Sequence, residues 1–193
     1  MGRTKSRSNR SGRDDAAMPV LGLDIGGVIV DYAESEPGAT LIGPEWIRSN
    51  PVPLALEAVA ALVAGPFGDN VHLVSKAGPK MESRTLVWLD RIGFFDATGV
   101  RRDHVVFVRR REDKAVECRR LAVTHVVDDR LAVLQHLMEV PHRYLFVGGL
   151  GERASPTQIP RWATVLHDWT EVDQLLVSSD QSRSDGTEGG VGQ

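Results

Sequence analysis

The chain has 193 residues, of which 41% are hydrophobic and 25% charged, with a formal net charge of -3 at pH 7. This length and composition suit one globular domain and exclude two large ones. The small net charge gives no general reason to expect a nucleic-acid partner, and the single cysteine, Cys118, excludes an internal disulfide and a thiolate metal cluster. No apolar run approaches the roughly 20 residues of a membrane helix, and the N-terminus lacks a secretory signal, so we expect a cytoplasmic protein without a membrane partner.

The two ends differ in composition from the rest of the chain. The first 13 residues contain five basic side chains, no acidic residue and no apolar stripe: Arg3, Lys5, Arg7, Arg10 and Arg13. We therefore expect a disordered basic arm over residues 1–17, the one segment that offers RNA or another anionic partner a weak electrostatic contact. Residues 178–193 are rich in Ser, Gly and Asp and are expected to form a disordered tail. An α/β domain over residues 18–177 remains.

Within this domain, short β-branched runs alternate with segments of helical spacing. In chain order, the pattern predicts a strand at 20–24, a helix at 53–64, a strand at 71–75, a helix at 80–93, strands at 104–108 and 124–129, a helix at 129–139, and strands at 144–149 and 163–169. One face of the second helix carries Met81, Thr85, Trp88, Leu89 and Ile92. The alternation predicts a three-layer α/β sandwich with a doubly wound, mainly parallel sheet. Ligand chemistry is then expected at the carboxyl ends of the strands.

Polar residues stand at several of these strand ends. Asp24 stands at the end of the first strand, and Ser75 comes directly after VHLV. Asp128 and Asp129 follow THVV, and Lys114 precedes that last strand. Each has an ordinary structural reading: a terminal aspartate often caps a helix, a serine after a strand is commonly a turn residue, and a lysine in a charged run is often solvated. Their order along the chain favours a common site.

At these positions the sequence resembles the haloacid dehalogenase superfamily of phosphohydrolases. The resemblance spans about residues 20–150 and rests on LDIGGVIVD, VHLVS, Lys114 and VVDD. The stretch REDKAVECRRLAVTHVVDDR is similar to the capless, deoxyribonucleotidase-type members. Only about 45 residues separate Asp31 from Ser75, which leaves no room for a large cap domain, although residues 33–50 are long enough for a flap over the site.

The resemblance implies a metal-dependent reaction in which Asp24 attacks phosphorus and forms an aspartyl-phosphate. Mg²⁺ would be held by Asp24, the backbone carbonyl of Gly26 and Asp128, with Asp129 binding it through water or supporting another ligand. The metal would neutralise the phosphoryl oxygens, which a carboxylate would otherwise repel. The substrate would be a small phosphorylated molecule, with nucleotides included in that class.

The resemblance also assigns the groups that bind the phosphoryl oxygens. Lys114 would supply a fixed positive charge to these oxygens and restrain the nucleophile, and Ser75 would donate a hydrogen bond to one of them. Both are therefore expected catalytic residues as well as phosphate-binding residues. Gly27, in the loop after the nucleophile, completes the predicted phosphate-binding set.

The sequence departs from this family at position 26. There the phosphatases carry a second aspartate, which protonates the leaving alcohol and later activates water, whereas this chain has Gly26. Such a general acid and base typically contributes about 10²- to 10⁴-fold in rate. Glu34, Glu36, His72 and His104 are the side chains considered as substitutes.

Two other function classes stay open. A pseudoenzyme that binds a phosphorylated ligand or a partner fits the loss of the second aspartate, although retention of Asp24, Ser75, Lys114 and Asp128 argues for chemistry. The letters LDIGG also resemble the phosphate loop of actin-like sugar kinases, and FVGGLG resembles an adenosine-contacting glycine pair. Such kinases need two duplicated domains and a hairpin after the first loop, and this chain is too short for them.

Overall fold

The structure is a computed structural model that describes residues 18–32, 38–149 and 158–172. The arm expected at 1–17 and the tail expected at 178–193 lie outside these residues. Six strands form one sheet in the order β3-β2-β1-β4-β5-β6, and every neighbouring pair is parallel. The strands are β1 (Leu21–Leu23), β2 (Val71–Lys76), β3 (Val105–Val108), β4 (His125–Asp128), β5 (His142–Phe146) and β6 (Thr164–Leu166). All six expected strands are present.

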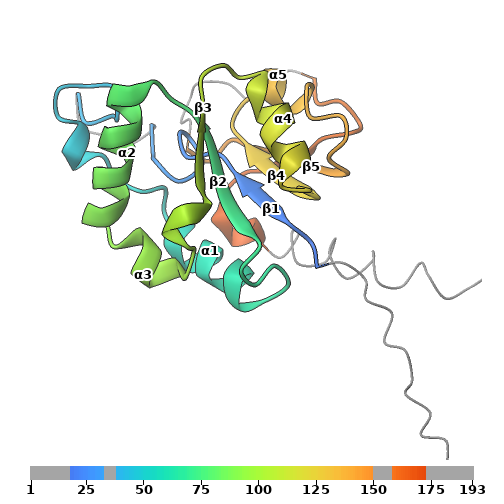
Figure 1. The fold of residues 1–193 in the computed structure, drawn as a ribbon, viewed down its shortest axis with the longest axis horizontal. Helices are drawn as coiled ribbons and strands as arrows, with labels where there is room; N and C mark the ends of the chain where they lie inside the picture. The colour runs from blue at the N-terminus through green and yellow to red at the C-terminus, as the bar shows by residue number, and fades with distance from the viewer. Residues whose placement is uncertain (1–17, 33–37, 150–157, 173–193) are drawn as a thin grey trace, which may run out of the picture.

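Helices cover both faces of this sheet (Figure 1). One face is covered by α1 (Ala55–Ala64), α2 (Pro79–Arg91), α3 (Phe94–Thr98) and the 3₁₀ turn η3 (Trp169–Val172). The other is covered by α4 (Asp113–Arg120) and α5 (Leu131–Leu134). Two further 3₁₀ turns, η1 (Trp46–Arg48) and η2 (Arg102–His104), lie between these elements. The fold is therefore the expected three-layer α/β sandwich with an open parallel sheet, and residues 18–32, 38–149 and 158–172 include no large cap domain.

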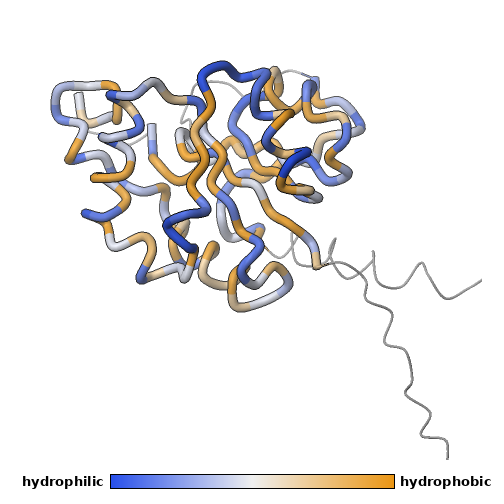
Figure 2. Tube along the Cα trace, in the orientation of Figure 1, coloured by the Kyte–Doolittle hydropathy of each residue, from blue (hydrophilic) through white to orange (hydrophobic). Residues whose placement is uncertain are grey.

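The core consists of two apolar clusters separated by the sheet. Along β4, Val127 belongs to the α1–α2 side and Val126 to the α4–α5 side. Along β5, Phe146 belongs to the α1–α2 side and Leu145 to the α4–α5 side, as expected from the two-residue period of a strand. Figure 2 shows the resulting hydrophobic colour along the central strands. Because both faces are covered, the strands read as continuous apolar runs in the sequence.

The helical face predicted for α2 is confirmed, since Thr85, Trp88 and Leu89 are buried and Met81 and Ile92 pack against the same cluster. The helix expected at 129–139 is shorter than predicted. After Leu134 the chain continues in tight turns, in which the amides of His136 and Leu137 bond to carbonyls three residues earlier. These turns preserve the apolar spacing that indicated a longer helix.

The helices α3 and α4 were not predicted from periodicity. The residues of α4 are mostly charged, and only Lys114 and Cys118 are buried in it. No helix in the described ranges combines the length and the apolarity needed to cross a membrane.

Candidate active site

Strand register brings the first and last acidic motifs together. Leu23 of β1 pairs with Val127 of β4, and the Asp24 amide donates to the Val127 carbonyl over 2.9 Å. The next residues along the two strands are Asp24 and Asp128. Both are one residue beyond a side chain that faces α1, so both carboxylates point towards the face that α4 covers.

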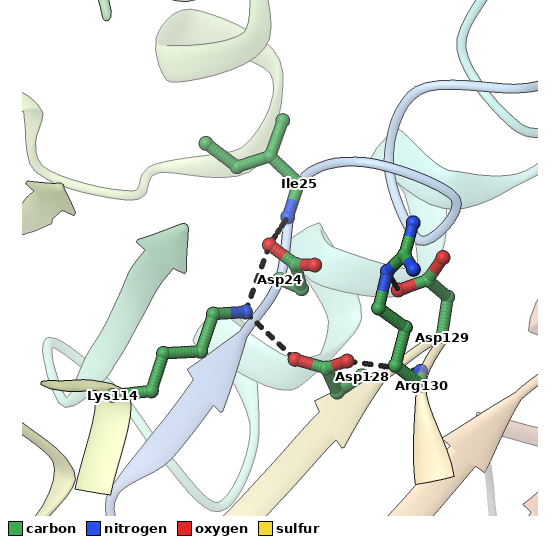
Figure 3. Close-up of polar contacts among 6 residues, drawn as sticks. All are labelled: Asp24, Ile25, Lys114, Asp128, Asp129 and Arg130. Carbon is green, nitrogen blue, oxygen red and sulfur yellow. Dashed lines mark hydrogen bonds and ion pairs between the residues drawn. The ribbon is translucent and has the colours of Figure 1, made fainter. Parts of the chain in front are cut away.

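Lys114 of α4 lies between these two carboxylates (Figure 3). Its Nζ is 2.7 Å from Asp128 Oδ2 and 3.1 Å from Asp24 Oδ1, and the residue is only 3% exposed. Burial alone would lower the pKa of Lys114, but the charges of Asp24 and Asp128 outweigh it and raise the pKa above its ordinary value. The ammonium is therefore charged at all physiological pH values, and the reading of Lys114 as a solvated helix residue is wrong.

The nucleophile candidate Asp24 has one engaged oxygen. Its Oδ1 accepts the Ile25 amide over 2.8 Å and the ion pair from Lys114. No described residue donates a hydrogen bond to Oδ2. The two contacts on Oδ1 fix the orientation of the carboxylate and leave Oδ2 without a partner among the described residues.

Asp129 adds a third carboxylate to the site. Ligand atoms of Asp24, Asp128 and Asp129 all lie within 4.8 Å of one another. Burial, followed by the charges of Asp24 and Asp128, raises the pKa of Asp129 to about 7. Burial and the Asp24 charge likewise raise the pKa of Asp128, although Lys114 opposes them. One lysine thus leaves the negative charge of three buried carboxylates incompletely compensated.

This carboxylate set fits a hard divalent cation. The Oδ1 atom of Asp129 is buried without a hydrogen-bond partner, and the Arg130 Nε is 3.7 Å away from it. Three oxygen donors with excess negative charge are the ligands that Mg²⁺ prefers. The Gly26 carbonyl remains a predicted further ligand.

Asp24 and Asp129 line a cavity of about 130 Å³ at the carboxyl ends of the strands. Asp24, Gly26, Ser75, Lys114 and Asp129 all line it, so the structure brings these predicted residues together. Asp128 stands behind Lys114 and is 1% exposed.

Gly27 is not among the residues that line this cavity. Its amide donates to the Val30 carbonyl over 2.9 Å, and its φ of +74° is one that glycine adopts readily. A Cβ at this position would lie 2.8 Å from Asp129 Oδ2. The structure therefore gives Gly27 a part in shaping the loop beside Asp129.

The space beside Gly26 is filled by Tyr32. A Cβ built on Gly26 would lie 2.5 Å from the Tyr32 hydroxyl oxygen, and Tyr32 also lines the cavity. Burial, then the charges of Asp24 and Asp129, raises the pKa of Tyr32 to about 12, so the phenol stays protonated at neutral pH. Position 26 accordingly has no room for a carboxylate in this arrangement.

Sequence reasoning missed Tyr32 and the cationic rim of the cavity. The rim consists of Lys76, Arg111 and Arg130. Of these, only Arg130 has an ion pair with a described residue, the 3.7 Å contact to Asp129. Arg111 stands in the charged run around Lys114, and the density of arginines there was the available signal. No local pattern indicated Tyr32.

The substitute acids considered from the sequence do not reach this cavity. His72 and His104 stack on each other with ring centroids 4.2 Å apart, and His104 Nδ1 lies 3.2 Å from the Val71 carbonyl at the start of β2. They are therefore near the opposite ends of the strands. Glu34 and Glu36 lie outside the described residues.

The expected flap borders the cavity in part. Leu41 and Ile42 line it, and the Arg84 guanidinium holds this segment through the carbonyls of Leu41 and Gly43, at 3.2 and 3.3 Å. Residues 33–37 of the same segment lie outside the described residues.

Comparison with known proteins gives matches in three-dimensional structure only. No profile of a known protein family matches the chain, and no curated protein matches it. A haloacid dehalogenase family hydrolase from Deinococcus radiodurans, solved with bound phosphate and sodium, aligns with a TM-score of 0.60 and 13% identity over 86% of this chain and 98% of its own. This chain has the haloacid dehalogenase-like fold.

Two larger structures with the same description align less closely. A haloacid dehalogenase-like hydrolase from Burkholderia xenovorans gives a TM-score of 0.50 at 14% identity, and one from Xanthomonas campestris gives 0.48 at 15%. They cover 73% and 74% of this chain, which spans only 64% and 60% of their length. In this chain β1 pairs in parallel with β2 and β4, and no hairpin follows it in the described residues. The chain therefore differs from the actin-like sugar kinases, which need a hairpin after the first loop.

Proposed function

We propose that this protein is a metal-dependent phosphohydrolase that reacts through an aspartyl-phosphate at Asp24. The observation that carries this proposal is the Asp24–Lys114–Asp128 arrangement, which orients one carboxylate at the edge of a small cavity and leaves its Oδ2 unengaged. Because Asp24 lines the cavity, this unengaged oxygen is available to a ligand bound there. Asp24 Oδ2 would attack phosphorus, and water would then release phosphate from the same oxygen.

The other residues of the cavity would bind and orient the phosphoryl group. Lys114 balances the charge of Asp24 and Asp128 and holds the nucleophile in place. Ser75 lines the same cavity and would donate its hydroxyl to a phosphoryl oxygen. Mg²⁺ held by Asp24, Asp128 and Asp129 would neutralise the remaining phosphoryl charge.

The rim supports a small phosphorylated molecule as substrate. Lys76 and Arg111 extend from the cavity onto a neighbouring surface that also includes Arg109 and Arg110. Such a cluster attracts dianionic esters, and nucleotides belong to this class. The Deinococcus radiodurans protein was solved with bound phosphate and sodium, which supports an anionic phosphate ligand and a cation for this chain as well.

A binding role without turnover is the second candidate, because Gly26 supplies no proton donor.

An assay with purified protein and Mg²⁺ against alkyl, aryl and acyl phosphates and nucleotides separates the hydrolase from the binding protein. We expect phosphate release, a phosphorylated protein detectable by mass spectrometry, and loss of both in Asp24→Asn. Asp103→Asn, an exposed residue paired with Arg101, is the matched control and should behave as wild type. Phosphate binding by wild type without any release, or equal release by Asp24→Asn, would refute the hydrolase proposal.

A further inference from the structure

Tyr32 lines the cavity, and its hydroxyl lies against Gly26 in the loop after Asp24. Its oxygen lies 2.5 Å from the position of a Cβ on Gly26, and two of its ring carbons lie 3.3 Å from that position. Gly26 is two residues beyond Asp24, and all three residues line the cavity. The hydroxyl therefore shares one small cavity with the carboxylate that would attack phosphorus.

The chain positions this hydroxyl through a closed loop. The Ile25 carbonyl accepts the amides of Ile29 and Val30, each at 2.8 Å, so the chain reverses direction directly after the strand. The Tyr32 amide then donates to the Gly149 carbonyl over 3.0 Å, and the ring packs against the core cluster on the α1 side. These contacts anchor Tyr32 at both backbone and ring.

Asp129 belongs to the carboxylate set that would hold the cation, and the remaining polar groups of the cavity are poorly suited to give up a proton. Lys114 is held between two carboxylates, and the guanidinium groups of Arg111 and Arg130 do not lose protons in proteins. The aliphatic hydroxyls of Ser75 and Thr85 are much weaker acids than a phenol. The Tyr32 hydroxyl has no hydrogen bond with any residue that the structure describes, so its proton can be given to a ligand.

We propose that Tyr32 is the proton donor to the leaving-group oxygen, an inference that rests on the phosphohydrolase function proposed above. In a cavity of about 130 Å³, the ester oxygen of a phosphate bound at Asp24 lies close to the walls, and Tyr32 carries the most acidic of the hydroxyl groups on them. Donation of a proton to a departing alkoxide is the contribution that general acids make to such reactions.

The two half-reactions balance with this assignment. First, Asp24 Oδ2 forms a bond to phosphorus, the bond from phosphorus to the ester oxygen breaks, and that oxygen takes the proton of Tyr32, which becomes a phenolate. Then a water oxygen attacks phosphorus and gives its proton to the Tyr32 phenolate, while the bond from phosphorus to Asp24 breaks. The sum is ester plus water giving alcohol plus phosphate, with both side chains restored.

The test compares leaving groups of different acidity in Tyr32→Phe and wild type with Mg²⁺. An alkyl phosphate needs protonation of its leaving oxygen, whereas 4-nitrophenyl phosphate needs little. We expect Tyr32→Phe to lower kcat/KM for the alkyl ester by about 10²- to 10⁴-fold and for 4-nitrophenyl phosphate by less than about 10-fold. The chain has one other tyrosine, Tyr144, which is buried in the core, and Tyr144→Phe should leave this selectivity unchanged.

A double variant tests whether a carboxylate at position 26 can replace the Tyr32 hydroxyl. Gly26→Asp alone should be destabilised, because its Cβ meets the Tyr32 oxygen, but Tyr32→Phe removes that oxygen. We expect Gly26→Asp combined with Tyr32→Phe to recover alkyl phosphate hydrolysis relative to Tyr32→Phe alone. Equal slowing of both substrates by Tyr32→Phe, or no effect on either, would overturn the role of Tyr32 and leave the hydrolase proposal intact. Absence of hydrolysis by wild type would overturn both.

Discussion

At the scale of single residues, Asp129 is the carboxylate least compensated by its surroundings. Its pKa in the folded protein is about 7, whereas the ordinary value is 3.8. In metal-free protein the folded state therefore holds this proton more tightly than the unfolded state. The contribution of Asp129 to the free energy of unfolding must fall as the pH rises from about 4 through about 7, and a bound cation would remove this penalty.

We predict that Asp129→Asn stabilises the metal-free protein at pH 8, on the order of 1–3 kcal/mol, and that the gain disappears near pH 4. The same variant should lose most of the stabilisation that Mg²⁺ gives to wild type. Thermal melts with chelator and with Mg²⁺ at the two pH values measure both effects. A gain that is the same at pH 4 and pH 8 would contradict the electrostatic account, and Asp103→Asn supplies the exposed control.

At the scale of elements, the ion pairs of Lys114 hold α4 against the sheet. Lys114 and Cys118 are its only buried residues, so this helix has little apolar surface to dock with. One carboxylate directly follows β1 and the other ends β4, and these strands are adjacent in the sheet. The ammonium of one helix thus joins two strands, and its removal would leave two buried carboxylates facing each other.

We predict that Lys114→Met lowers the free energy of unfolding of metal-free protein by about 3–5 kcal/mol at pH 8, because a buried charge without its partner is costly. Adding Asp128→Asn to this variant should recover part of the loss. Urea denaturation of the variants measures both changes, with exposed Lys76→Met as a control expected to lie within about 0.5 kcal/mol of wild type. Wild-type stability in Lys114→Met would show that the pair does not hold the helix.

At the scale of the whole molecule, a single sheet joins both halves of the core. Neighbouring residues of one strand, such as Val126 and Val127, belong to opposite clusters. Leu62 of α1 and Leu134 of α5 lie deep in these two clusters and are each 0% exposed. Neither cluster can lose its packing without disturbing strands that the other also needs.

We predict that Leu62→Ala and Leu134→Ala each lower the free energy of unfolding by about 2–5 kcal/mol and leave a single urea transition with an unchanged slope. Exposed Met138→Ala should have little effect. Circular dichroism and tryptophan fluorescence should report the same midpoint for each variant. Separate midpoints for the two probes would show that the halves unfold independently.

The sequence by itself determined the strands, their parallel arrangement and the acidic residues at their ends. These features are local: a strand is recognised from a few consecutive apolar residues, and parallel strands put their carboxyl ends at one edge. Asp24, Ser75, Asp128 and Asp129 could therefore be predicted as neighbours. Lys114 was a candidate from its place before the last of these strands, and the resemblance supplied its role, since a lysine in a charged run is often solvated.

Only the tertiary structure decided the burial of Lys114 and the place of Tyr32. The burial of Lys114 depends on how α4, which contacts β2 and β3, packs over the sheet, and a mostly charged helix carries no periodic signal of that packing. Tyr32 meets Gly26 because hydrogen bonds turn the chain back after Ile25, and the contact joins residues of no common element. In the sequence, position 26 is a glycine where the related phosphatases have an aspartate. In the structure, the phenol of Tyr32 occupies the space beside this glycine. This contact could not be predicted from the sequence, because it depends on all the hydrogen bonds and packing contacts that close the loop.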